Sequence, residues 1–82
     1  MLQRQLGQRI AGLRKPLGMT QVRLAMAVGC SVGFINLVER GVNAPSVARL
    51  EDFAKALKVE GAELFIFDPR KRRRMPSRVE KT

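Results

Sequence analysis

Few side chains in this chain are suited to acid–base, nucleophilic or metal chemistry. Its 82 residues include seven Asp or Glu, one cysteine (Cys30) and no His, Trp or Tyr. Without histidine the commonest general acid–base group is missing, and a single thiol makes neither a disulfide nor a cysteine-based metal site. The carboxylates Glu51 with Asp52, and Glu60 with Glu63, are interpreted as solvated or helix-capping groups. The sequence therefore predicts no enzyme, no metal and no cofactor.

The strongest chemical signal is positive charge. Sixteen Lys and Arg against seven Asp and Glu give a net charge of +9, which favours a polyanionic partner, either nucleic acid or an anionic membrane surface. The longest stretch without charge, residues 24–38, has 15 residues, fewer than the roughly 20 that span a bilayer. The N-terminus also lacks the apolar run of a secretory signal. We therefore expect a cytoplasmic protein whose partner is nucleic acid and not a membrane.

The charge is concentrated near the C-terminus. Residues 1–67 hold nine basic and five acidic side chains, whereas residues 68–82 hold seven basic and two acidic ones. The five consecutive cations at 70–74 repel one another, and Pro69 marks the point where the folded part stops. We predict a folded domain over residues 1–68 and a basic, disordered tail over 69–82. The tail either lies along DNA phosphates or remains solvated.

Apolar residues at helical spacing predict an all-α domain. We expect five helices: one ending near Pro16, then about 20–28, about 31–40, one capped by Ser46, and a short one from Glu60. Thr20 and Ser31 are the other predicted N-caps. The predicted inward-facing residues are Leu6, Ile10, Leu13, Leu17, Val22, Ala25, Val28, Ile35, Val38, Val47, Leu50, Phe53, Ala54, Leu57, Leu64 and Phe65. Residues 64–67 could instead form a strand, although nothing else in the chain resembles a partner strand.

The second and third predicted helices have the spacing of a helix-turn-helix unit. They are joined by a short turn that contains Gly29, as in DNA-binding pairs whose second helix enters the major groove. The matching residues are Thr20-Gln21-Val22-Arg23-Leu24-Ala25, Val28-Gly29-Cys30-Ser31, Ile35, Val38-Glu39-Arg40-Gly41 and Pro45-Ser46. On these residues the chain resembles the lambda-repressor-like helix-turn-helix family, which includes Cro and the phage repressors (XRE family). The resemblance covers about residues 6–67.

The resemblance implies five helices, recognition of double-stranded DNA by helix 31–40, and usually a two-fold dimer. It implies phosphate contacts for Thr20 and Gln21 and a DNA contact for Arg23. It also implies base contacts for Ser31, Val32, Gly33, Asn36 and Leu37, and phosphate contacts for Arg40, Asn43 and Ala44. It also implies that Arg14 and Glu39 form a partly buried structural ion pair, not a DNA contact.

The base-reading positions depart from the family pattern, because Val32, Gly33 and Leu37 are apolar. Only Ser31 and Asn36 can hydrogen-bond to bases, so DNA shape is expected to carry much of the specificity. Alternatively, Phe34 and Leu37 are buried in a protein interface.

The apolar run Leu64, Phe65, Ile66 and Phe67 exceeds what so small a core needs, and it predicts a homodimer. We therefore predict a sequence-specific transcriptional regulator, most simply a repressor that occludes a promoter. The alternatives are an antitoxin paired with a toxin, a restriction–modification controller, and a protein-interaction adaptor that does not touch DNA.

Overall fold

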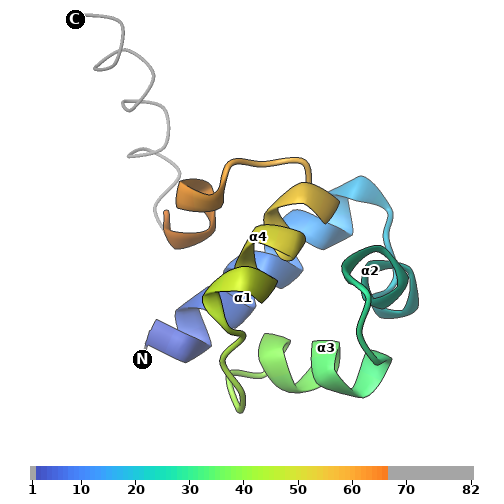
Figure 1. Ribbon diagram of the computed structural model, residues 1–82, viewed down its shortest axis with the longest axis horizontal. Helices are drawn as coiled ribbons and strands as arrows, with labels where there is room; N and C mark the ends of the chain where they lie inside the picture. The colour runs from blue at the N-terminus through green and yellow to red at the C-terminus, as the bar shows by residue number, and fades with distance from the viewer. Residues whose placement is uncertain (1, 67–82) are drawn as a thin grey trace, which may run out of the picture.

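The computed structural model describes residues 2–66, and these form a helical domain (Figure 1). Its elements are α1 (Leu2–Arg14), η1 (Lys15–Leu17), α2 (Gln21–Val28), α3 (Val32–Glu39), α4 (Val47–Ala56) and η2 (Gly61–Phe65), where η denotes a 3₁₀ helix. The all-α class is confirmed. The count of five α-helices is wrong, because the last predicted helix is the single 3₁₀ turn η2. The predicted domain boundary at residue 68, Phe67 and the basic tail lie outside the described residues.

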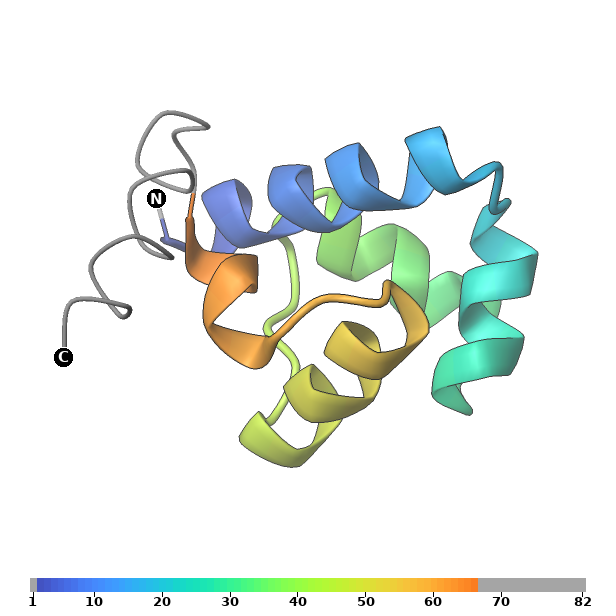
Figure 2. The same cartoon turned by 90° about the horizontal axis from the view of Figure 1, so that it is seen from above.

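The helices surround a central core from five sides. In Figure 2, α1 and α4 face each other across the core, α2 closes one end and η2 the other, and α3 lies behind. α3 packs against both α1 and α2. In Figure 1 it forms the lower edge of the molecule, where no other described element covers its outer side. The fold therefore holds α3 from within and leaves one of its faces open.

Hydroxyl side chains begin three of the helices, as predicted. The hydroxyl oxygens of Thr20, Ser31 and Ser46 accept hydrogen bonds from backbone N–H groups three residues later, at 3.0, 3.1 and 3.2 Å. Each bond satisfies an N–H group that has no partner within its own helix. The first helix also ends near Pro16 as predicted: α1 stops at Arg14, the 3₁₀ helix η1 follows, and the chain then turns at Gly18, whose φ is 73°.

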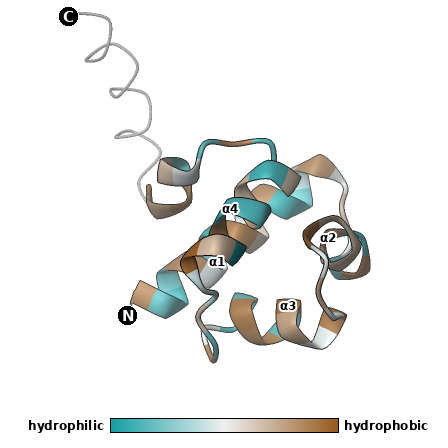
Figure 3. Ribbon diagram, viewed as in Figure 1, coloured by the Kyte–Doolittle hydropathy of each residue, from teal (hydrophilic) through white to brown (hydrophobic). Residues whose placement is uncertain are grey.

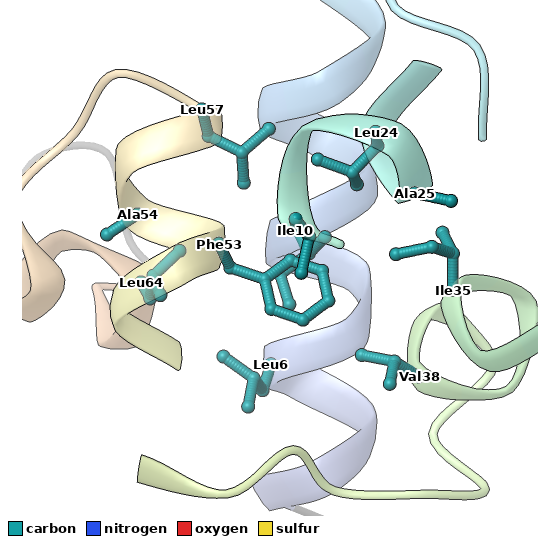
Figure 4. Close-up of a cluster of buried hydrophobic side chains, with 11 residues drawn as sticks. Leu6, Ile10, Leu24, Ala25, Ile35, Val38, Phe53, Ala54, Leu57 and Leu64 are labelled. Atoms are coloured by element: carbon teal, nitrogen blue, oxygen red, sulfur yellow. The ribbon is translucent and has the colours of Figure 1, made fainter. Parts of the chain in front are cut away.

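The core is built around Phe53, whose ring lies between α4 and α1 and points toward Ile10 (Figure 4). Both side chains are fully buried, as are Leu24, Ile35 and Leu64. Four residues predicted to face inward are exposed instead: Leu17, Val22, Val47 and Phe65, the last three by 54%, 76% and 43%. Val22 and Val47 lie in the first turns of their helices, where the i, i+3 pattern alone selects the wrong face.

Within the described residues, no single helix is long and apolar enough to cross a membrane. α2 and α3 together pass on length and composition, but they are bent by 109° at the break between them.

Candidate nucleic-acid interface

α2 and α3 form a helix-turn-helix pair. Their axes differ by 109°, within the roughly 90–120° typical of such pairs. Gly29 makes the turn possible, because its φ of 89° belongs to the left-handed region that favours glycine. The backbone N–H groups of Gly29 and Cys30 both donate to the carbonyl of Ala25, at 2.8 and 3.0 Å. These bonds end α2 and direct the chain into α3.

Arg49, on α4, holds this turn and was missed by the sequence analysis. Its Nη1 donates to the carbonyl oxygens of Val28 and Gly29, both at 3.3 Å, and lies 3.9 Å from Asp52 Oδ2. A cation beside the last carbonyls of α2 is electrostatically favourable. No sequence pattern pairs residues 21 positions apart, so the signal is visible only in the fold.

The outward face of α3 carries the five residues predicted to meet bases. Ser31, Val32 and Gly33 are exposed, Val32 by 44%, while Asn36 and Leu37 are partly exposed. The opposite face is fixed in the core by the buried Ile35 and Val38, and Phe34 packs against the same core. Figure 3 shows that α3 is mainly hydrophobic. The structure thus leaves a largely apolar face of α3 accessible.

Asn36 carries the main polar group in the middle of this face. Its Oδ1 accepts a hydrogen bond from Arg40 Nη1 at 3.5 Å, a long contact between exposed groups. A contact of this length is weak and gives way easily to a better partner. The Asn36 side chain is therefore held near Arg40, and its amide remains able to form hydrogen bonds with a donor and an acceptor on another molecule.

The other residues predicted to contact DNA lie at the start of α2 and just after α3. Thr20 and Arg23 are exposed at the start of α2, and Arg40 and Asn43 are exposed after α3. Gln21 is only partly exposed, because its Nε2 donates to Glu39 Oε1 at 2.9 Å. This bond links the first residue of α2 to the last residue of α3.

Beneath the surface, Arg14 and Glu39 form an ion pair whose side chains are only 11% and 7% exposed. Arg14 Nε and Nη2 donate to the two carboxylate oxygens at 2.7 and 3.1 Å, and Nη1 donates to the carbonyl of Met19 at 2.8 Å. With Gln21, the pair ties α1, α2 and α3 together. A bidentate geometry with further hydrogen bonds is what a buried pair requires.

Two glycines bring α1 close to α3: Gly7 was missed by the sequence analysis, and Gly41 entered it only as part of the motif at the end of helix 31–40. A Cβ on Gly7 would overlap the carbonyl oxygen of Val38, and one on Gly41 would lie 2.8 Å from Arg4 Cα. Gly41 also has a φ of 80°. A glycine in the middle of a helix was the available signal at position 7, since glycine is unfavourable there unless backbones meet.

Cys30 lies in the turn, half-buried against the core. Burial raises the pKa of its thiol above the ordinary value, and the nearby positive charge of Arg49 opposes this in part. A thiol with a raised pKa is a weak nucleophile at neutral pH. Its place in the turn is therefore a packing position.

A helix-turn-helix family model (HTH_3) matches residues 10–64. The HTH-type transcriptional regulator YazB of Bacillus subtilis is 41% identical over 58 residues, which cover 71% of this chain and 84% of YazB. A second regulator, y4wC of Sinorhizobium fredii, is 39% identical over 72% of this chain, which spans only 41% of that relative.

Solved structures show the same fold. The restriction-modification controller protein C.AhdI of Aeromonas hydrophila superposes with a TM-score of 0.74 at 35% identity, over 76% of this chain and 94% of that one. The clp gene regulator ClgR of C. glutamicum superposes with a TM-score of 0.79 at 30% identity, over 82% and 86%. The resemblance drawn from the sequence motifs is confirmed. The chain belongs to the helix-turn-helix family of DNA-binding transcription regulators.

Proposed function

We propose that α3 enters the major groove of double-stranded DNA and that its outward face meets base edges. The observation that supports this most is the combination of a buried inner face, at Ile35 and Val38, with an exposed outer one. An isolated α-helix fits the width of the B-DNA major groove. α3 is held from behind by α1 and α2 and has one free side, which suits that fit.

Phosphate contacts at both ends of the pair would set the orientation. The N-terminus of α2, with Thr20 and Gln21, offers backbone N–H groups and a positive helix dipole to an anion. Because Glu39 holds one N–H of the Gln21 amide, the second N–H is available to a phosphate in a fixed direction. Arg23, Arg40 and Asn43 would add contacts on either side.

We expect this face of α3 to make few sequence-specific contacts with base edges. Asn36 can pair with the N6 and N7 positions of adenine, whereas Val32 and Leu37 offer only apolar contacts to thymine methyl groups. A large share of the specificity then rests on DNA shape and deformability.

We infer a homodimer that pairs through Phe65 and Ile66, with Phe67 beyond the described residues. Phe65 is 43% exposed and Ile66 is partly exposed. Leu64, expected to join this surface, is fully buried in the core and takes no part. A two-fold dimer would place the two α3 helices about 34 Å apart, one turn of DNA. Repression by occlusion of a promoter, in the cytoplasm, is the simplest outcome.

The test is a titration of the full chain against genomic fragments at rising salt. Protection of a discrete site is expected, and Gln21→Ala should weaken binding to every sequence alike. Asn36→Ala should relax the preference at one base pair by roughly 1–3 kcal/mol. Binding that is lost uniformly as salt rises, with no discrete site, would contradict sequence-specific regulation. No binding to duplex DNA at moderate salt would favour the adaptor hypothesis, and co-purification with the product of an adjacent gene would favour the antitoxin hypothesis.

A restriction–modification controller is the second candidate. It is favoured by the match to C.AhdI, which is covered almost completely, over 94% of its length. Methylase and nuclease genes beside this one, with the protected site upstream of them, would support it. A protected site next to unrelated genes would exclude it.

A further inference from the structure

The side of α1 opposite α3 bears a groove that DNA binding does not use. One part, of about 380 Å³, lies between the end of α1 and the segment after α4 and is lined by Leu13, Pro16, Leu17, Leu57 and Val59. A second part, of about 250 Å³, continues along α1, and both parts share Arg9 and Gly12.

Helical geometry separates this groove from the DNA-facing side. Gly7 and Arg14 contact α3 residues, and at 100° per residue Arg9 and Gly12 lie on about the opposite side of α1. A partner in the groove would leave the outer face of α3 free.

Gly12 keeps the groove open, and the fold does not require a glycine there. A Cβ built on Gly12 meets no heavy atom within 4 Å, unlike one on Gly7. Glycine inside a helix costs about 0.5–1 kcal/mol relative to alanine. At Gly7 the close approach of α3 explains that cost. At Gly12 the space left by the missing side chain is part of the groove itself.

Lys58 gives the groove its charge. It is exposed, lines the groove, and adopts a φ of 62°, which is uncommon for a residue with a side chain. Arg9 forms the wall where the two parts meet, and its Nε donates to the carbonyl of Glu63 at 2.9 Å. The residues that line the two parts include no carboxylate.

We propose that this groove binds a short acidic and apolar segment of a partner protein, with leucine-like side chains over Leu13, Leu17 and Val59 and a carboxylate at Lys58. Charge complementarity selects this occupant. The apolar floor takes the hydrophobic side chains, and the exposed Lys58 at the rim favours an acidic partner. A second copy of the chain, with a net charge of +9, fits such a rim less well.

The test uses the full ¹⁵N-labelled chain and an amphipathic helical peptide of Glu and Leu, about 12 residues and roughly 18 Å long. A peptide with Lys in place of Glu is the control probe. Saturable binding of the acidic peptide is expected, with amide shifts centred on Gly12, Leu17 and Lys58. The basic peptide should bind weakly.

Variants separate the groove from the rest of the surface. Gly12→Leu favours the helix and fills the groove, so it should raise the Kd for the acidic peptide at least about tenfold. Gly12→Ala is the matched control and should change the Kd little. Lys58→Glu should raise the Kd for the acidic peptide and lower the Kd for the basic one. Asn36→Ala should leave the Kd of each peptide unchanged.

Three results of the peptide titrations would overturn the proposal: no saturable binding, shifts centred on α3, or equal binding by Gly12→Leu. Loss of a dimer in Gly12→Leu during sedimentation would make a second copy the occupant and would equally overturn it. Because DNA affinity is measured separately, failure of the groove proposal leaves the DNA-binding proposal untouched.

Discussion

At the scale of single residues, Glu39 connects the surface proposed to meet DNA to the interior. Its carboxylate accepts hydrogen bonds from Arg14 and Gln21, so one acidic group positions side chains on α1 and α2. Fixing the first residue of α2 to the last residue of α3 sets the distance between the proposed phosphate and base contacts. The proposed DNA contacts thus depend on Glu39, whose side chain is itself only 7% exposed.

Glu39→Ala leaves the Arg14 guanidinium buried without its carboxylate, and we expect it to lower the free energy of unfolding by about 3–5 kcal/mol. Urea denaturation measures the change. Arg14→Ala combined with Glu39→Ala should cost less than the sum of the single variants, because each single change leaves one charge uncompensated. Additive costs, or a loss below about 1 kcal/mol for Glu39→Ala, would show that the pair does not hold the three helices together.

The thiol of Cys30 offers a pH-dependent check on the packing of the turn. Alkylation requires the thiolate, and burial raises the pKa of this thiol. The rate of alkylation by iodoacetamide should therefore rise with pH around a midpoint above that of an unstructured cysteine peptide. After unfolding in urea the two midpoints should coincide. A midpoint at or below the peptide's value in the folded protein would place Cys30 in a more exposed or more cationic setting than the structure shows.

At the scale of the elements, the two interior glycines of α1 have opposite consequences. We expect Gly7→Ala to destabilise the fold by about 1–3 kcal/mol, because the added methyl group overlaps the backbone of α3. Gly12→Ala meets open space and should stabilise it by about 0.5–1 kcal/mol through helix propensity. Urea unfolding of both variants measures the difference. Equal effects would mean that α1 does not approach α3 at Gly7.

Most of the helices and caps were predictable because their signals are local. The hydroxyl caps at Thr20 and Ser31 and the glycine turn at Gly29 are each encoded within four residues. Interior positions such as Ile10 and Phe53 follow from spacing, since they lie in the middle of their helices. The assignments that were wrong lie at the ends of helices, where few neighbours constrain the face: Val22 and Val47 lie in first turns, and Leu17 and Phe65 are the last residues of η1 and η2.

The remaining features could not be read from spacing because they are contacts between distant segments. Arg49 lies on α4 and donates a hydrogen bond to the carbonyl of Val28 at the end of α2, and Gly41 packs closely against Arg4. The prediction of a fifth α-helix was wrong for a different reason, which is the length of the segment. Five residues with a buried Leu64 satisfy a helical pattern, yet they are enough only for one 3₁₀ turn. At the interface, the motif predicted which residues are exposed, whereas the bond from Gln21 to Glu39 required the structure.

At the scale of the whole molecule, the domain has three separate surfaces, each proposed to bind a different partner. α3 lies at one edge, the groove beside Gly12 lies on the opposite side of α1, and the exposed Phe65 lies in η2. These three surfaces share no residue, so the proposed binding of DNA, a second copy and a partner segment can be tested with separate variants.

Phe65→Glu tests the proposed dimer surface. A carboxylate there would be buried without a partner on association, so we expect the chain to sediment as a monomer. Because Phe65 is 43% exposed, the fold itself should survive, and far-UV circular dichroism checks this. Val47→Glu, at another exposed apolar position, is the matched control and should not alter the oligomeric state. A dimer that persists in Phe65→Glu would place the two-fold interface elsewhere.

Methylation protection on a selected DNA site shows whether α3 enters the major groove. Dimethyl sulfate modifies guanine N7 in the major groove and adenine N3 in the minor groove. If α3 lies in the major groove, guanine N7 is protected in two half-sites about one helical turn apart, and adenine N3 stays accessible. Protection of adenine N3 alone, or full affinity with no protected N7, would contradict this placement of α3.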